Sequence, residues 1–262
     1  MSDSRAVAVV TGAGSPDGIG FACARLLVET GHRVAICSTT GRIHERAKEL
    51  RSTGREVWSE VVDLMDPAAA HAFATGVARQ LGDVSILVNN AGMTAVGVQA
   101  ENGSIANTSD ALWSEGINRN LTSAFVMTRA VLESMQLRGY GRIVNVTSVT
   151  GPVMAMHNDV VYAAAKAGMV GLTRATALDS APHGVTVNAV APGWIATPSS
   201  SPEEIEEGKL SPVGRPGRAD EVAAVVAFLC SPSASYLTGQ LVVVDGGNSI
   251  HEERWRPPAT RA

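Results

Sequence analysis

The residues best suited to chemistry in this chain are Tyr162 and Lys166, four positions apart, with Ser148 fourteen residues before the tyrosine. Residues four apart lie on one face of a helix. An ammonium beside a phenol favours the phenolate, so we expect Lys166 to lower the pKa of Tyr162 from its reference value of about 10. Ser148 follows an apolar stretch and can hold a substrate oxygen by a hydrogen bond. The three side chains together predict proton transfer to the oxygen of a carbonyl group whose carbon receives a hydride.

A glycine-rich turn lies near the N-terminus, in the segment Thr11-Gly-Ala-Gly-Ser-Pro-Asp-Gly-Ile-Gly20. It follows an apolar run and leads into a helical pattern over 19–30. Glycines permit a tight turn and close backbone approach, and a helix N-terminus presents unpaired N–H groups to a pyrophosphate. An ordinary strand-to-helix connection is the weaker interpretation. The turn predicts a dinucleotide site formed by Gly12, Gly14, Ser15, Gly18, Ile19 and Gly20.

The end of the second expected strand carries no Asp or Glu, the residue that accepts from the adenosine ribose 2′-hydroxyl in many NAD-binding folds. It reads Cys37-Ser-Thr-Thr-Gly-Arg42, and hydroxyls with a guanidinium suit a 2′-phosphate. We therefore predict NADP(H) over NAD(H), with Ser38 and Thr39 beside Arg42 at this end. Arg42 is almost as well explained as a solvated helix residue. Asp63, after the third strand, either meets the adenine or caps the next helix.

Short runs rich in Val, Ile and Leu alternate with longer amphipathic segments, which is typical of βα units around a buried parallel sheet. Right-handed crossovers would give an α/β, doubly wound, seven-stranded parallel sheet with helices on both faces. Asp66-Pro67 predicts the start of a helix that ends at Leu81, and Asp220 that of another ending before Pro232. The expected strands are 6–10, 33–38, 56–61, 86–89, 142–147, 186–191 and 241–244.

The length and composition favour one catalytic domain spanning residues 1–262. With 21 basic and 25 acidic residues, the net charge of −4 favours a small-molecule partner over nucleic acid or a membrane. The three cysteines are far apart in apolar surroundings, which indicates buried thiols rather than disulfides. No residue cluster has metal-ligand spacing, so no metal is expected. No apolar run is long enough for a signal peptide or a bilayer span, and the cytoplasm is the expected location.

Two polar segments, 94–110 and 198–217, are expected to be loops above the carboxyl ends of the strands, where ligands bind in this architecture. The second contains an acidic cluster, which we interpret as solvated: Glu203, Glu204, Glu206 and Glu207. The polar tail, 248–262, is expected to be flexible or to dock on a neighbouring subunit.

In order and spacing, these motifs resemble the short-chain dehydrogenase/reductase family over residues 5 to about 249. The subgroup most similar in appearance contains 3-oxoacyl-acyl-carrier-protein reductases and many secondary alcohol dehydrogenases. The residues that carry the resemblance are Thr11 to Gly20, Asn89-Asn-Ala-Gly92, Asn120, Ser148, Tyr162 with Lys166, Pro192-Gly193 with Thr197, and Asp245-Gly-Gly247.

The resemblance implies a Rossmann fold, a homotetramer and a catalytic tetrad of Asn120, Ser148, Tyr162 and Lys166. It places Asn120 in a distorted helix, where a water joins Lys166 to solvent, and Asn118 is the alternative assignment. It also implies cofactor contacts at both ends of the dinucleotide. These are Asp63 and Leu64 at the adenine, Asn90, Ala91 and Gly92 at the adenosine ribose, Tyr162 and Lys166 at the catalytic end, and Ile195 and Thr197 at the carboxamide.

The chain departs from the family pattern in its glycine-rich turn, where Gly12 and Gly18 enclose five residues instead of the usual three. The segment from Ser148 to Tyr162 is also longer and the lid after Thr197 shorter, changes that concern substrate selection more than chemistry.

The implied activity is interconversion of a ketone and a secondary alcohol with NADP(H), a 3-oxoacyl thioester being one candidate substrate. Met154 and Trp194 are the candidates for the substrate pocket. A catalytically silent NADP-binding sensor on the same fold is the alternative from a different class. An enoyl reductase is the nearer enzymatic alternative, and the four-residue spacing of Tyr162 and Lys166 weighs against it.

Overall fold

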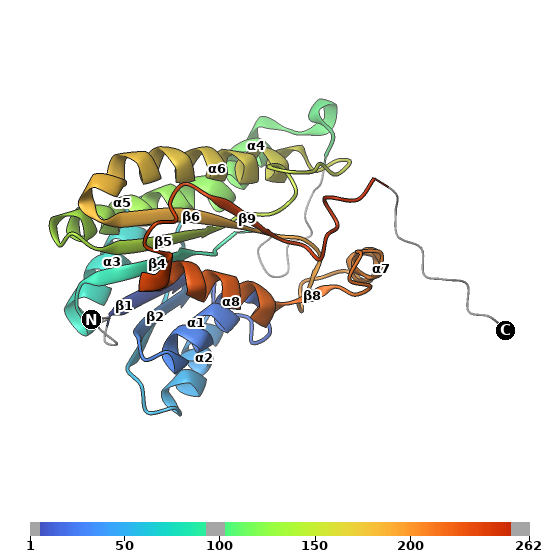
Figure 1. The fold of residues 1–262 in the computed structure, drawn as a ribbon. Helices are drawn as coiled ribbons and strands as arrows, with labels where there is room; N and C mark the ends of the chain where they lie inside the picture. Colours follow the sequence, from blue (N-terminus) through green and yellow to red (C-terminus); the bar gives the residue numbers. More distant parts are fainter. Residues whose placement is uncertain (1–5, 93–102, 253–262) are drawn as a thin grey trace.

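A parallel sheet of seven strands forms the centre of the computed structural model, which describes residues 6–92 and 103–252 (Figure 1). The strand order is β3-β2-β1-β4-β5-β6-β9, and every pairing is parallel. The predicted seven-stranded Rossmann-type fold is confirmed, with strand ends within two residues of expectation. The strands are β1 (Val7–Thr11), β2 (Arg33–Ser38), β3 (Val57–Val61), β4 (Val84–Asn89), β5 (Gly141–Val146), β6 (Val185–Pro192) and β9 (Leu241–Val244).

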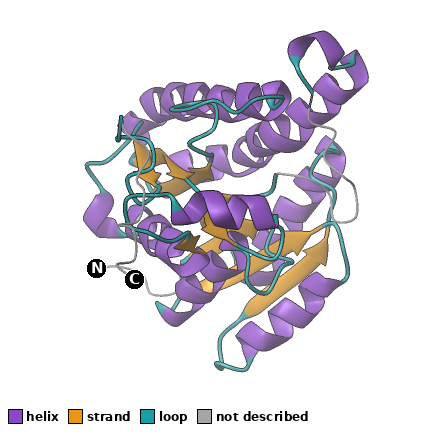
Figure 2. Cartoon of the chain, turned by 90° about the vertical axis from the view of Figure 1, so that its right-hand side faces the viewer, coloured by secondary structure: helices purple, strands orange, loops and turns teal. Residues whose placement is uncertain are grey.

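Helices cover both faces of the sheet, as Figure 2 shows from the side. Successive strand residues point to opposite faces. Ala8 and Val10 therefore pack with α1, α2 and α8, whereas Val7 and Val9 pack with α3 and α5. Burial on both faces explains why the central strands are apolar at nearly every position. The main helices are α1 (Ile19–Glu29), α2 (Arg42–Arg51), α3 (Pro67–Leu81), α4 (Asp110–Ile117), α5 (Ser123–Leu137), α6 (Val160–Ser180) and α8 (Ala219–Cys230).

The two helices predicted from their end signals are present. The Asp66 carboxylate accepts from the N–H of Ala68 at 2.8 Å and caps α3, which ends at Leu81 before Gly82. The second, α8, ends at Cys230, two residues before Pro232. Local capping chemistry was therefore sufficient to locate these helix ends.

The prediction that 198–217 is only a loop was wrong. The acidic cluster forms the helix α7 (Pro202–Lys209), between two short paired strands, β7 (Ile195–Ala196) and β8 (Gly217–Arg218). Ser201 and Glu204 form a reciprocal capping box at its start. Glutamates in the first turn are also favourable near the positive end of the helix dipole. Of the other expected loop, 93–102 lie outside the described residues, and Asp110 begins α4.

Of the expected tail, residues 253–262 also lie outside the described part of the chain. Within residues 6–92 and 103–252, no helix combines the length and apolar character that crossing a bilayer requires. Cys23, Cys37 and Cys230 are free and buried, as their apolar surroundings predicted.

Candidate active site

The carboxyl end of β5 and the first turns of α6 bring three of the four predicted catalytic side chains together. Ser148 lies two residues beyond β5, and its hydroxyl is near enough to the Tyr162 phenol to lower the pKa of that group. The Lys166 ammonium nitrogen lies 5.5 Å from the centre of the Tyr162 ring. The Ser148 hydroxyl also accepts from the N–H of Thr150 at 3.1 Å, which fixes its orientation. The phenol and the serine hydroxyl are therefore in position to share one substrate oxygen.

Lys166 is held inside the protein at the base of this group. Its side chain is buried, and Nζ donates to the carbonyl of Val146 at 3.1 Å. Gly92 approaches it closely: a Cβ built on Gly92 would lie 3.3 Å from Lys166 Nζ and 2.8 Å from Asn120 Oδ1. Lys166 therefore lies between the end of β5, at Val146, and the segment after β4, at Gly92. Asn120 lies beside the same glycine.

Asn120 lies in a π-helical segment, Asn118–Thr122, between α4 and α5. The helix distortion that the resemblance implied is therefore present. Asn120 is buried and donates from Nδ2 to the carbonyl of Gly116 at 3.2 Å, with Oδ1 toward Gly92. Asn118 is exposed and accepts from the hydroxyl of Thr122. The geometry favours Asn120 over Asn118 as the residue beside Lys166.

The expected lowering of the Tyr162 pKa was wrong. Burial raises the pKa of Tyr162 to about 12; the hydrogen bond from Ser148 opposes this rise, and the charges of Asp159 and Glu204 add to it. Burial also lowers the pKa of Lys166 to about 8. The spacing of the two residues does not show how deeply the folded chain buries them. At neutral pH the phenol therefore keeps its proton, which is the form that an acid needs.

The glycine-rich turn fits closely against the residues that follow β4. A Cβ on Gly12 would lie 2.8 Å from the Cα of Ala91, and one on Gly20 would lie 2.4 Å from Asn90 Nδ2. Asn90 Nδ2 donates to the carbonyls of Thr11 at 3.0 Å and Gly12 at 3.1 Å. The Thr11 hydroxyl accepts from the N–H groups of Asn90 and Ala91. The glycines are thus required by packing, and the Asn90 side chain braces the turn.

The start of α1 is open to an anion. Gly18 is the N-cap and provides no side-chain cap, and no acidic residue lies in the first turn. The two extra residues of the turn are accommodated by a bend in which the N–H of Gly18 donates to the carbonyl of Ser15 at 3.2 Å. Asp17 is exposed. A helix N-terminus with free N–H groups behind a glycine turn fits the pyrophosphate of a dinucleotide.

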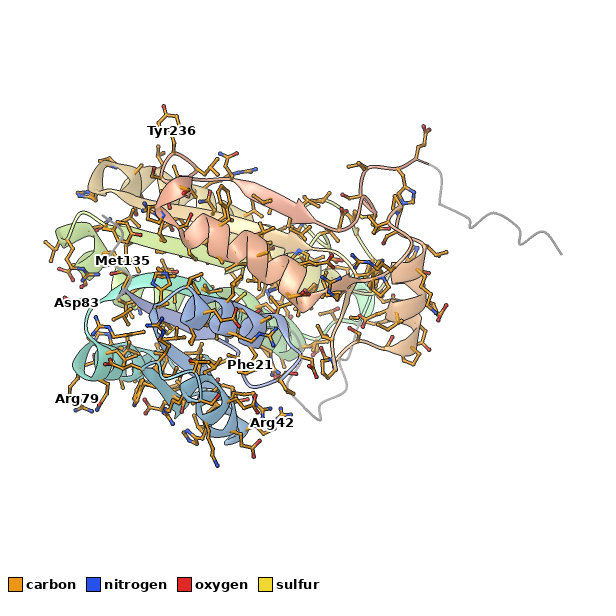
Figure 3. The ribbon with its side chains drawn as sticks, turned by 60° about the horizontal axis from the view of Figure 1, so that its bottom comes forward. Phe21, Arg42, Arg79, Asp83, Met135 and Tyr236 are labelled. Atoms are coloured by element: carbon orange, nitrogen blue, oxygen red, sulfur yellow. The ribbon has the colours of Figure 1, made fainter. Side chains whose placement is uncertain are left out.

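At the end of β2, Ser38 organises the backbone. Its hydroxyl donates to the carbonyl of Thr40 at 3.1 Å. A Cβ on Gly14 would lie 2.8 Å from the Ser38 hydroxyl oxygen. Arg42 begins α2, is exposed, and donates from Nε to the hydroxyl of Thr40 at 3.3 Å. Figure 3 shows Arg42 at the surface. With exposed Thr39, these groups form a polar edge suited to a phosphate.

Beyond β3, Leu64 is buried and Asp63 is exposed. The Asp63 carboxylate accepts from the N–H of Met65 at 2.9 Å, whereas Asp66 caps the next helix. The alternative that Asp63 caps this helix is therefore wrong, and its side chain lies at the surface beside Leu64.

At the other end of the site, a serine that the sequence analysis did not identify connects Ile195 and Thr197. The Ser200 hydroxyl donates to the carbonyl of Ile195 at 2.8 Å and accepts from the N–H of Thr197 at 3.1 Å. The side chain of Ile195 packs against Gly217, where a Cβ would lie 2.6 Å from Cδ1. The side chain of Ile195 is half-buried, with Cδ1 on the Gly217 side. The run of hydroxyl residues after Thr197 was the available signal.

The two candidates for the substrate pocket differ in their surroundings. Trp194 is half-buried, and its carbonyl accepts from the N–H of Gly217. Met154 is exposed, and its sulfur accepts from Asn248 Nδ2 at 3.7 Å. The segment after β9 thus reaches the loop that follows Ser148.

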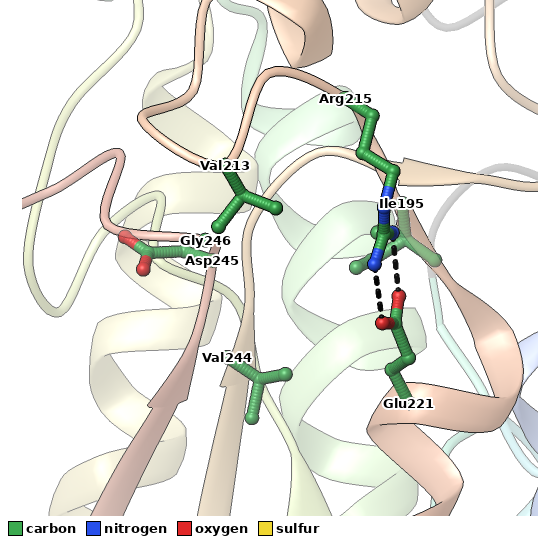
Figure 4. A pocket seen from close by; sticks show the side chains of 8 residues that line it. Ile195, Val213, Arg215, Glu221, Val244, Asp245 and Gly246 are labelled. Carbon is green, nitrogen blue, oxygen red and sulfur yellow. Dashed lines mark hydrogen bonds and ion pairs between the residues drawn. The ribbon is translucent and has the colours of Figure 1, made fainter.

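One cavity, of about 120 Å³, lies beside the candidate site, between the lid and the end of β9 (Figure 4). Arg215 and Glu221 form a bidentate ion pair on its wall, at 2.9 and 2.7 Å. Ile195 belongs both to the wall of this cavity and to the predicted cofactor site. The cavity is lined by Ile195, Val213, Arg215, Gly217, Glu221, Val244, Asp245 and Gly246.

The fold and this site define a nicotinamide-dependent oxidoreductase of the Rossmann type. A family model described as enoyl-(acyl carrier protein) reductase matches residues 12–249. The chain belongs to the short-chain dehydrogenase/reductase family, whose members act on CH–OH groups with NAD(P).

Individual relatives cover nearly the whole chain. The putative ketoacyl reductase of the monensin polyketide synthase from Streptomyces virginiae is 39% identical and covers 94% of this chain and 98% of its own. The 3-oxoacyl-[acyl-carrier-protein] reductase of Vibrio cholerae is 38% identical, over 92% of this chain and 96% of its own. A variant of actinorhodin polyketide ketoreductase, solved with NADPH, superimposes with a TM-score of 0.86 at 36% identity, over 96% of this chain and all of its own.

Proposed function

We propose that this protein reduces the ketone of a 3-oxoacyl thioester to the secondary alcohol with NADPH. The observation that carries the proposal is the grouping of Tyr162, Ser148 and Lys166 at the carboxyl end of a dinucleotide-binding sheet, with a Tyr162 pKa raised by burial. The relatives named as ketoacyl reductases, matched over more than nine-tenths of the chain, support the substrate class.

Different residues of the site carry out proton transfer and positioning. When bound, the nicotinamide cofactor supplies the hydride. Tyr162 donates its proton to the developing alkoxide, and Ser148 donates a hydrogen bond to the same oxygen. A positioned general acid typically contributes about 10²- to 10⁴-fold, and a preorganised donor to an oxyanion about 10²- to 10³-fold. The Lys166 ammonium stabilises the phenolate that remains, and Asn120 adjoins Lys166 at Gly92.

The preference for NADP(H) rests on the polar edge at Ser38, Thr39 and Arg42. A guanidinium recognises phosphate oxygens by charge-assisted hydrogen bonds, and no carboxylate ends β2 to repel them. The ketoreductase solved with NADPH supports the same choice. The remaining candidate contacts would hold the cofactor along the turn from Gly12 to Gly20 and at Asn90, Ala91 and Gly92.

The experiment measures NADPH oxidation with a 3-oxoacyl thioester, with the 2-enoyl thioester of the same chain length, and with simple ketones. We expect turnover with the 3-oxoacyl compound and none with the enoyl compound. Turnover of the enoyl thioester alone would establish alkene reduction instead. Cofactor binding without oxidation across the whole panel would establish a silent sensor.

The homotetramer, the single catalytic domain and the cytoplasmic location remain predictions. Exposed apolar side chains on α5 and α6, Phe125 and Leu178, are consistent with an assembly through these helices. Sedimentation equilibrium gives the assembly directly, and a monomer at micromolar concentration would contradict the tetramer.

A further inference from the structure

A chain of buried side-chain amides and hydroxyls joins four elements around the site: β4, β5, α5 and α6. Asn89 at the end of β4 donates from Nδ2 to Asn145 Oδ1 on β5 at 2.8 Å and to the hydroxyl of Thr128 on α5 at 3.0 Å. Asn145 donates in turn from Nδ2 to the hydroxyl of Thr173 on α6 at 2.8 Å. Asn89, Asn145 and Thr173 are 2%, 1% and 0% exposed, so water does not compete for these hydrogen bonds.

The hydrogen bond between Asn145 and Thr173 is one of three that join α6 to successive residues at the end of β5. Asn145 bonds to Thr173, the carbonyl of Val146 accepts from Lys166 Nζ, and the hydroxyl of Thr147 donates to the carbonyl of Lys166 at 2.8 Å. Ser148 is the next residue along the chain. The strand segment that presents Ser148 is thus bonded, residue by residue, to the helix that presents Tyr162.

These bonds constrain α6 in a way that its apolar contacts do not. Burial of apolar surface is non-directional, so by itself it does not specify the rotation and depth of a helix on a sheet. A buried amide or hydroxyl that loses its partner costs about 1–3 kcal/mol, and its hydrogen bonds have preferred directions. Asn89 Oδ1 has no hydrogen-bond partner within the described part of the chain.

We propose that Asn145 and Thr173 are positioning residues for the reaction: their hydrogen bond sets the depth and rotation of α6 so that Tyr162 meets Ser148. Neither residue contacts the substrate or the cofactor in this role. Thr173 lies two turns beyond Lys166, on the same buried face of α6. The kinetic test of this proposal rests on the proposed function. Its structural test depends on geometry alone.

The kinetic test compares Thr173→Val, which keeps the shape and removes the hydroxyl, with Thr173→Ser, which keeps the hydroxyl. We expect Thr173→Val to lower kcat about 10-fold, which is within the loss that a misplacement of about 1 Å can cause. The Kd for NADPH should stay within about twofold of the wild-type value. Thr173→Ser should restore kcat. Deuterated NADPH should give a larger isotope effect on kcat in Thr173→Val, because hydride transfer becomes more rate-limiting.

Val226→Ala is the matched control for a general loss of stability. Val226 is fully buried on α8, on the opposite face of the sheet. It should lower the melting temperature without changing kcat at temperatures where the protein is folded. If Thr173→Val keeps wild-type kcat, or if Val226→Ala loses as much kcat as Thr173→Val, the positioning role is refuted.

Crystal structures of the wild type and Thr173→Val give a readout that does not need a substrate. We expect α6 to shift on the sheet and the distance between the hydroxyl oxygens of Tyr162 and Ser148 to increase. An unmoved α6 would refute the proposal even in an active enzyme. If the wild type reduces no carbonyl compound at all, the proposed function fails, and the two structures still decide the positioning role.

Discussion

Lys166 Nζ and the carbonyl oxygen of Val146 are 3.1 Å apart, and their hydrogen bond ties the lysine to the strand that ends just before Ser148. Because the lysine is only 2% exposed, its ammonium cannot turn outward into solvent without opening the core. Its position relative to Tyr162 is therefore a property of the fold. This fixed cation beside a protonated phenol is the basis of the predictions that follow.

Replacing Tyr162 by Phe should abolish proton donation while keeping the ring that packs beside Lys166. We expect kcat for ketone reduction to fall by about 10²- to 10⁴-fold, the usual contribution of a positioned general acid. Binding of NADPH, measured by fluorescence titration, should stay close to wild type. Activity near the wild-type level would show that another group supplies the proton.

Replacing Gly92 by Ala should damage the site through packing. The new Cβ would lie 2.8 Å from Asn120 Oδ1 and 3.3 Å from Lys166 Nζ, and φ of +154° is strained for a residue with a side chain. We expect a loss of about 1–3 kcal/mol in the free energy of unfolding and a large fall in kcat. Gly171→Ala, in the middle of α6 with no atom within 4 Å, is the control and should be neutral or stabilising by about 0.5–1 kcal/mol. Urea unfolding and initial rates test both, and equal behaviour of the two variants would contradict the packing argument.

Replacing Asp159 by Asn should raise stability at neutral pH. Burial, and then the charge of Glu204, raise the pKa of Asp159 to about 6 in the folded chain. The folded state therefore binds the proton more tightly than the unfolded state, and this carboxyl stabilises the protein below about pH 4. That contribution is lost as the pH rises from about 4 to 6. The advantage of Asp159→Asn should be present at pH 7 and disappear below about pH 4 in thermal melts.

The same substitution should act on Tyr162, whose pKa the charge of Asp159 helps to raise. In Asp159→Asn the phenol should titrate at a lower pH, which phenolate absorbance measures in a chain of only three tyrosines. An unchanged titration curve would place the Asp159 carboxylate outside the electrostatic surroundings of Tyr162.

Replacing Arg42 by Ala should reduce selectivity for NADPH over NADH. A lost charge-assisted hydrogen bond costs about 1.5–3 kcal/mol, so we expect KM for NADPH to rise about 10- to 100-fold while KM for NADH changes little. Lys48→Ala, which removes an exposed cation from the same helix, controls for the general loss of positive charge. Equal increases for both cofactors in Arg42→Ala would remove Arg42 from the 2′-phosphate site.

Local sequence signals located the strands, the ends of α3 and the glycine-rich turn. Their physical cause lies within a few residues: short continuous apolar runs, the Asp66 cap, and glycines where the backbone of Ala91 comes close. The helix α7 was missed because its acidic composition was interpreted as a solvated connection. Its capping box, Ser201 with Glu204, was present in the sequence as a signal of a helix start.

The sequence by itself determined the candidate groups for the chemistry, because the identities and spacing of Ser148, Tyr162 and Lys166 are those of a proton-transfer site on a dinucleotide-binding sheet. Only the tertiary structure decided the electrostatics, because a pKa depends on burial and on charges from distant segments, and these raised the Tyr162 value that spacing alone predicted to fall. The structure likewise assembled the buried chain from Asn89 to Thr173, since hydrogen bonds between residues 28 and 56 positions apart form only when the sheet and α6 have packed.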